Sequence, residues 1–352
     1  MLETTFSNVL KHSKMIYKTI FTGRLEFGSQ KSYDKVLKMY HHRVENYYKS
    51  DILLTEEEIF DPASTSLNVP RFITQGSVKS WKNTVSLLEY LAQFAISGNL
   101  GTWVTEEGNI LHQGFVEPKS DKVVVQAFLK GRDLSNQEGK EVEAKEALSQ
   151  AISKYERHAQ AYERRGFVNC ILKNYTDAIY DFTKSIDMAP GMPDPYFGRA
   201  RIKMLKEDYS GAIQDFDNAI KKSIPLQAIY WKSRRLKADC HLKLNDYKGA
   251  LNDFKFYSAR NFKPNDPNKV WQRYTTYHYG RALLETKEYE LAIAAFTKAM
   301  TIEEGVEATP IGPMHLYRGD SRRKAGKTGY LKDWQAALKL GVKEAKPRID
   351  NR

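Results

Sequence analysis

Cysteine, long apolar runs and secretion signals are what this sequence has least of. Its 352 residues include only two cysteines, Cys170 and Cys240, both within helical patterns, so we expect buried thiols rather than a disulfide framework. No stretch approaches the roughly 18 consecutive apolar residues that a membrane-spanning helix needs. Residues 1–23 carry scattered lysines without the apolar core or cleavage site of a signal peptide. We therefore expect a cytoplasmic chain without a membrane partner.

Motifs for metal binding and catalysis are also missing. The eight histidines show neither an H-E-x-x-H pair nor a Cys/His spacing suited to zinc. The segment Ala325–Gly329 resembles a phosphate loop, but the glycine needed five positions before Gly326 is Ser321. No nucleophile elbow or dinucleotide fingerprint is present. We predict a protein that is not an enzyme and that has no catalytic residues, metal or cofactor.

The charge balance is positive, with 55 Lys and Arg against 43 Asp and Glu, a formal net charge of +12. Such a balance favours acidic partners: nucleic acid, acidic or phosphorylated peptides, or an anionic surface. The positive residues are spread along the chain rather than gathered in one run, so solubility alone is an equally good explanation. Charge therefore leaves the partner open.

A pattern of small and large residues recurs down the second half of the chain. In five of six copies a small residue precedes a large apolar residue by four positions, and Tyr330 takes that place in the last, degenerate copy. The large residues are separated by 34, 34, 38, 42 and 38 positions. A second small residue lies twelve positions before four of the first ones. The residues predicted to form the structural core of these copies are Gly166, Ala178, Phe182, Ala200, Ala212, Phe216, Ala238, Ala250, Phe254, Gly280, Ala292, Phe296 and Trp334.

This pattern resembles the tetratricopeptide repeat (TPR), a 34-residue pair of antiparallel helices with small residues at positions 8 and 20 and proline near 32. With Ala159 as position 1, Gly166, Ala178 and Pro190 fall at positions 8, 20 and 32. The resemblance covers residues 141–341 and implies an all-α superhelical solenoid, in which neighbouring helix pairs stack to share one core. Small residues at the crossing let helix axes approach to about 8–10 Å.

The resemblance also implies a protein-interaction scaffold that binds its partner in a concave groove. In TPR proteins the first helix of each repeat lines this groove through positions 2, 5, 9 and 12. Arginine forks and aromatic rings there suit a protein or peptide with acidic groups, although ordinary solvated helix faces would carry similar residues. Nucleic-acid binding through the basic, tyrosine-rich surface is the alternative. The predicted partner-binding residues are Phe197, Arg201, Lys232, Arg235, Tyr274, Tyr277 and Arg281.

Two departures from the family pattern bear on the partner. One TPR subclass clamps acidic C-terminal tails with Lys and Asn, but Glu163 and Phe167 stand at those positions, so that clamp is not carried over. Three connections, 221–227, 261–269 and 301–313, are longer than the norm. Such insertions fall on one face of a solenoid and can build a binding site, and neutral drift explains them equally well.

Residues 1–130 do not show the repeat and are predicted to form an α+β domain of unknown role. The expected order is strand, helix, two strands, helix and further strands, which is ferredoxin-like. This fold has many functions, and the aromatic phrase of RNA-binding domains is missing. The expected strands are 15–27, 51–61, 68–76, a hairpin over 102–118 and 122–130, and the expected helices are 32–48 and 77–98, the second closed by Gly98.

The rest of the chain divides into three predicted parts. Residues 131–158 form a connecting or capping helix, because Glu141–His158 shows a second-helix pattern without a clear first helix. Residues 159–341 form an array of about five repeats, the last ending at Gly341. Residues 342–352 form a basic tail that we expect to be frayed. The sequence leaves the oligomeric state open.

Overall fold

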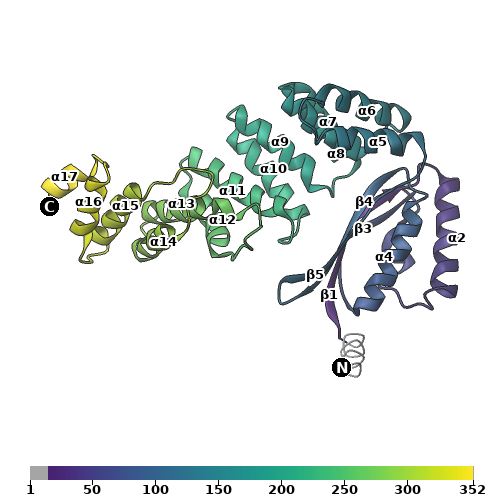
Figure 1. The fold of residues 1–352 in the computed structure, drawn as a ribbon, viewed down its shortest axis with the longest axis horizontal. Helices are drawn as coiled ribbons and strands as arrows, with labels where there is room; N and C mark the ends of the chain where they lie inside the picture. Colours follow the sequence, from purple (N-terminus) through teal and green to yellow (C-terminus); the bar gives the residue numbers. More distant parts are fainter. Residues whose placement is uncertain (1–14, 352) are drawn as a thin grey trace. The chain divides into compact units, whose positions relative to one another are not determined.

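The computed structural model describes residues 15–351, which form two compact units divided between Pro195 and Tyr196. The first unit contains a sheet domain and helices, and the second unit is helical (Figure 1). Within residues 15–351, no helix is long and apolar enough to cross a bilayer.

The first unit begins with a five-stranded antiparallel sheet in the order β2-β3-β1-β4-β5. β1 lies between β3 and β4, and a helix precedes each of the two β-hairpins. This is the split β-α-β arrangement of ferredoxin-like folds with β5 added at one edge, so the predicted α+β domain is confirmed. The strands are β1 (Tyr17–Glu26), β2 (Phe60–Asp61), β3 (Ser66–Gly76), β4 (Ser97–Glu106) and β5 (Asn109–Val116).

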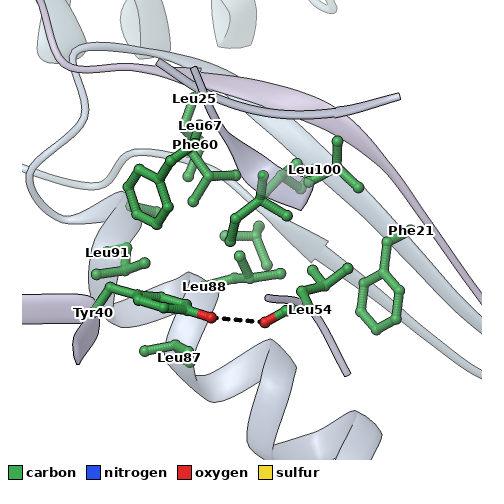
Figure 2. Packing of buried hydrophobic residues seen from close by; sticks show 14 of the residues in the cluster. Phe21, Leu25, Tyr40, Leu54, Phe60, Leu67, Leu87, Leu88, Leu91 and Leu100 are labelled. Carbon is green, nitrogen blue, oxygen red and sulfur yellow. Dashed lines mark hydrogen bonds between the residues drawn. The ribbon is translucent and has the colours of Figure 1, made fainter. Parts of the chain in front are cut away.

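Two amphipathic helices, α2 (Gln30–Asn46) and α4 (Val78–Ala92), pack on one face of this sheet. Each begins at a serine whose hydroxyl accepts a hydrogen bond from a backbone N–H in the first turn. Aliphatic side chains of α4 meet those of the strands in a continuous core (Figure 2). Tyr40 is also buried there, and its hydroxyl is satisfied because it donates to the carbonyl of Leu54 at 2.8 Å.

The predicted hairpin over 102–118 is confirmed as β4 and β5. Glu107 and Gly108 at its tip have φ of 48° and 80°. Positive φ at both central residues is typical of the tight turns that match the right-handed twist of paired strands.

Two local predictions in the sheet domain are wrong. Residues 51–61 contribute only the two-residue strand β2, because Thr55 and Glu58 form a capping box that starts the short helix α3 (Glu56–Ile59). Gly98 does not close a helix but belongs to β4, where its φ of 104° fits a close approach to the backbone of Arg24.

The valine-rich segment 122–130, predicted as a strand, is the helix α5 (Val123–Leu134). Its buried residues Val124, Ala127 and Phe128 recur at helical spacing, so packing overrides the β propensity of the valines. α5 packs against α6 (Glu141–Lys154), and Gly131 leaves room for the Leu148 side chain. The segment Glu141–His158 was predicted to be the second helix of a pair without a clear first helix, and α5 is that first helix. The predicted domain boundary at residue 130 stays a prediction.

Paired antiparallel helices form the rest of the chain, as the repeat pattern predicts. One pair closes the first unit, further pairs form the second unit, and a single-turn helix η1 (Lys269–Trp271) precedes α13. The pairs are α7 (Ala159–Ile171) with α8 (Tyr175–Met188), α9 (Pro193–Leu205) with α10 (Tyr209–Lys222), α11 (Ala228–Lys243) with α12 (Tyr247–Ala259), α13 (Gln272–Glu285) with α14 (Tyr289–Thr301), and α15 (Ile311–Lys324) with α16 (Tyr330–Lys339).

Every residue predicted for the repeat core is buried in the structure. Glycine is needed at the crossing in two of the pairs. A Cβ atom added to Gly166 would lie 2.8 Å from the Phe182 ring, and one added to Gly280 would lie 2.8 Å from Phe296. Small and large residues therefore interlock within each pair, which is how a repeat without a globular core of its own becomes stable.

The C-terminal residues differ from the prediction in one respect. α16 ends as expected before Gly341, whose φ is 85°. The tail is not frayed: α17 (Ala345–Asp350) follows, Ala345 is fully buried, and Arg348 Nε lies 2.7 Å from Asp320 Oδ1. A buried alanine and an ion pair fasten this last turn to α15 and α16.

Candidate functional site

A buried aspartate stands directly before the large aromatic residue in four of the repeats. Asp181 receives two hydrogen bonds from Arg165, with Nη2–Oδ1 and Nε–Oδ2 distances of 2.7 and 3.0 Å. Arg199 holds Asp215 in the same forked way at 2.8 and 2.9 Å. Planar guanidinium and carboxylate groups fit each other through two parallel bonds. These pairs therefore join the two helices of a repeat.

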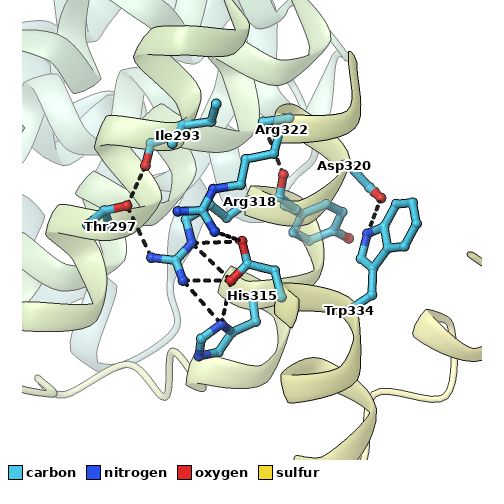
Figure 3. A network of polar contacts seen from close by, with 10 residues as sticks. Ile293, Thr297, His315, Arg318, Asp320, Arg322 and Trp334 are labelled. Carbon is cyan, nitrogen blue, oxygen red and sulfur yellow. Dashed lines mark hydrogen bonds and ion pairs between the residues drawn. The ribbon is translucent and has the colours of Figure 1, made fainter. Parts of the chain in front are cut away.

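The last repeat carries the densest of these clusters. Arg318 Nη2 and Arg322 Nη1 each lie 2.6 Å from an oxygen of Asp333, and His315 Nδ1 lies 3.1 Å away (Figure 3). Burial alone would raise the pKa of Asp333, but the hydrogen bonds from Arg318 and His315 hold it below its ordinary value. Arg318 also donates to Thr297 of α14 at 3.2 Å, so the cluster ties α15 to the preceding repeat.

The α11–α12 repeat carries a pair of the same kind. Arg234 and Lys237 similarly contact Asp253. The signal was present as an Asp-Phe or Asp-Trp pair recurring with the repeat, at Asp181, Asp215, Asp253 and Asp333, but the aspartates were not singled out. Ala295 takes this place in the α13–α14 repeat.

Three of the predicted groove residues do not join a common site. Phe197 packs against Phe216 with ring centroids 5.9 Å apart, and the exposed Arg201 lies over the Phe197 ring. Lys232 is exposed on α11. Their role in binding stays a prediction.

The other four, Arg235, Tyr274, Tyr277 and Arg281, gather around α13 in the second unit. They lie beside two adjacent hollows of about 390 and 290 Å³. Both hollows are lined by Tyr274 and His278, which stand between them. Tyr274, Tyr277, His278 and Arg281 follow one another at spacings of three, one and three, which places them on one face of a helix.

One side of the site is built on Asp239 of α11. Arg235 Nη1 lies 3.3 Å from Asp239 Oδ2, and the Tyr274 hydroxyl donates to Asp239 Oδ1 at 3.1 Å. Burial raises the pKa of Asp239 to about 6, against the opposing effect of Arg235. The Arg235 guanidinium also lies 3.7 Å from the Trp271 ring centroid, and its buried Nε has no hydrogen-bond partner.

The other side is an aromatic cluster. The Tyr274 and Tyr277 rings lie 4.3 and 4.9 Å from His278 between centroids, and burial lowers the pKa of His278 to about 4. Arg281 stacks on Tyr317 of α15 at 4.1 Å, and its Nε is buried without a hydrogen-bond partner. Arg235 is paired with Asp239, and Arg281 hydrogen-bonds to Tyr277, so the two guanidiniums are held in place at the edges of the site.

One of the long connections, 301–313, forms a wall of this site. Glu307 and Thr309 of the 301–313 connection line the larger hollow. Thr309 is buried and its N–H donates to Glu304 at 3.1 Å, while Arg273 lies 3.9 Å from Glu304. Gly305 lies against the backbone of Val270, where a Cβ atom would overlap the carbonyl. The 301–313 connection is therefore anchored to η1 and to the start of α13.

Sequence reasoning missed part of this site. His278 and Lys243 lie at helical spacing from Tyr274 and Asp239, so the period of 3.6 residues could have found both of them. Glu307 had no such signal, because its position depends on how the 301–313 connection packs. Among residues 15–351, no group of three His, Cys, Asp or Glu side chains is placed to hold a metal ion.

Positions 2 and 5 of the first repeat, which would face the groove in a typical TPR protein, have a structural function here. Gln160 accepts a hydrogen bond from the N–H of Gly98 at 2.8 Å, which fastens α7 to β4. Glu163 is buried, and burial raises its pKa to about 8. Neither side chain is offered to a partner, in agreement with the missing clamp.

Tetratricopeptide-repeat family models match residues 142–193 and 276–305. The first match covers α6, α7 and α8, and the second covers most of α13 and α14. The chain therefore carries tetratricopeptide repeats, and proteins built from such repeats are generally protein-interaction scaffolds and typically not enzymes. None of the curated proteins matches the chain.

Solved structures similar to the chain include two that are described as TPR proteins. YrrB, described as a TPR protein with an unusual peptide-binding site, is 14% identical, with 59% of this chain and 100% of YrrB covered at a TM-score of 0.48. MamA is 16% identical, with 53% and 94% covered at a TM-score of 0.42. A TPR protein from Parabacteroides merdae is 15% identical, with 91% and 98% covered at a TM-score of 0.38.

Proposed function

We propose that this protein is a non-catalytic cytoplasmic scaffold that binds a peptide segment of a partner protein across α11, α13 and the 301–313 connection. The observation that carries this proposal is the pair of adjacent hollows sharing Tyr274 and His278. Concave sites lined by aromatic side chains with a few converging polar groups are typical of ligand binding. Family membership makes a protein or peptide the expected ligand.

The cations at this site favour a partner with acidic groups. Lys243 is exposed at the smaller hollow, and Arg281 lines the same hollow with its Nε lacking a partner. Arg201 and Lys232 are exposed on α9 and α11. A carboxylate entering the smaller hollow would meet Lys243 and Arg281 together, which is a charge-assisted contact of the stronger kind.

Nucleic-acid binding is the second candidate, and the contacts favour it less. Several arginines, such as Arg165 and Arg318, are held against buried aspartates and are therefore not free to contact phosphates. Phosphate binding would lose affinity steeply between low and moderate salt. A strong salt dependence with single-stranded RNA or DNA, together with no peptide binding, would support this candidate instead.

A peptide-binding screen with the full chain tests the proposal. The probe is a positional-scanning library of fluorescent nonapeptides, read by fluorescence anisotropy. We expect a subset of peptides to bind, and Lys243→Glu to weaken them by about tenfold, because a groove charge is reversed. Lys255→Glu, an equally exposed lysine on α12, is the matched control and should leave binding unchanged. Equal binding by the two variants, or no selected peptide, would contradict the proposal.

A further inference from the structure

The two hollows on α13 differ in charge. Tyr274, Tyr277 and His278 give the larger hollow its aromatic walls, and Glu307 supplies a carboxylate. The other residues that line it are Ala308, Thr309, Pro310 and Pro313. The larger hollow is therefore aromatic with one negative charge.

The polar groups of the larger hollow include uncharged acceptors, and the Tyr277 hydroxyl takes part in a hydrogen bond with Arg281. Burial keeps the pKa of His278 at about 4, so its ring is uncharged at neutral pH. The Tyr274 hydroxyl gives its hydrogen to Asp239, which leaves its oxygen lone pairs as acceptors. The nearby guanidiniums of Arg235 and Arg281 stack on Trp271 and Tyr317 instead.

The smaller hollow has the opposite bias. Lys243 and Arg281 supply two positive charges, and Asp239 is already paired with Arg235. Tyr274 and His278 form the partition between this hollow and the aromatic one. A ligand that fills both hollows would need a cation on one side of this partition and an anion on the other.

We propose that the larger hollow is a subsite for a lysine or arginine side chain, and that the smaller hollow takes a neighbouring carboxylate of the same peptide. This inference rests on the proposed function and makes the partner segment bipolar rather than simply acidic. A cation over tyrosine faces gains cation–π attraction, and the gain grows as the site loses water. Glu307 adds an ion pair at the mouth, and its exposed position lets the guest enter.

The same nonapeptide library tests this inference with the full chain. We expect the selected peptides to carry Lys or Arg beside Asp or Glu. Glu307→Lys should weaken these peptides by about tenfold, because it places a second cation against the guest. Glu303→Lys, at another exposed residue of the same connection, is the matched control and should change affinity less than twofold.

A charge exchange gives the sharper result. A selected peptide with its basic residue changed to Glu should bind the unmodified chain at least tenfold more weakly, and Glu307→Lys should restore part of that loss. Peptides that lose affinity in Lys243→Glu but show no preference for Lys or Arg would overturn the cation subsite and leave the proposed function standing. No peptide selection at all would overturn both.

Discussion

Arginine has different environments in two regions of the second unit. Between α9 and α10, Arg199 is locked to the buried carboxylate of Asp215 by two hydrogen bonds. On the α11–α13 face, Arg235 and Arg281 lie on aromatic rings with one donor each left unpaired. The first arrangement joins the two helices of a repeat, and the second places guanidiniums on aromatic rings at the candidate site. Net charge alone does not separate the two roles, whereas an aspartate 16 positions later marks the first arrangement at Arg165 and Arg199.

The aromatic core beneath the ion pairs should give the largest effect. Phe216 is fully buried beside Ala200 and Ala212, so Phe216→Ala leaves a cavity that the neighbours fill only in part. We expect a loss of about 3–5 kcal/mol in the free energy of unfolding. Urea melts followed by circular dichroism measure it, and a loss under about 1 kcal/mol would mean that the repeat is packed differently.

The ion pairs between helices should come next. Asp215→Ala leaves Arg199 without its buried carboxylate, and we expect a loss of roughly 2–4 kcal/mol, reduced because the arginine is partly exposed. Asp187→Ala, at an exposed aspartate on α8, is the control and should cost no more than about 0.5 kcal/mol. Equal urea melts for the two variants would show that the pair has no structural role.

Acidification should separate the two regions. The pKa of His278 is about 4 when folded, below its ordinary value of 6.5, so its neutral form contributes stability above pH 6.5 that is lost as pH falls towards 4. Asp333, whose pKa is lowered, keeps its contribution until pH falls below its ordinary 3.8. Asp239 opposes His278, because its pKa of about 6 makes protonation favour the folded state between pH 6 and 3.8.

The variant His278→Gln isolates this effect. Between pH 7 and 5, the unmodified chain should lose roughly 1–3 kcal/mol more stability than the variant. Urea melts at each pH give the difference, and NMR titration of the His278 ring gives its pKa directly. A ring that titrates near 6.5 would show that His278 is hydrated and that the aromatic hollow is open to water at its base.

The smallest effect should come from the Tyr274 hydroxyl. Tyr274→Phe removes one hydrogen bond to Asp239 and keeps the ring between the two hollows. We expect a loss of about 0.5–1.5 kcal/mol in the free energy of unfolding, and the ring of residue 274 should keep its contacts with His278. Tyr247→Phe, at a second half-buried tyrosine that lines the smaller hollow, is the comparison. A larger loss in Tyr247→Phe would contradict the role given to Asp239.

Much of the repeat architecture could be predicted from the sequence, because the same packing of a small residue such as Gly166 against a large one such as Phe182 recurs in each repeat. The strand predicted at 122–130 failed because the valines of α5 meet α6, which single-sequence propensity does not include. The hairpin at Glu107 and Gly108 was found, since positive φ has a strong sequence signal.

The candidate site was predictable only in part. Tyr274, Tyr277 and Arg281 lie on a helix face, which periodicity describes. Glu307 reaches the site through a connection held by Gly305 and Thr309, and no periodic pattern encodes that path. The difference in charge between the two hollows depends on which cations are already paired, and only the structure shows that Arg235 is held by Asp239.

A crystal structure of the full chain with a selected nonapeptide tests the central claim most directly. The account predicts peptide density across α11 and α13, with a basic side chain between Tyr277 and Glu307 and a carboxylate at Lys243. Density on the sheet domain or along α12 and α14, with both hollows filled by water alone, would contradict it.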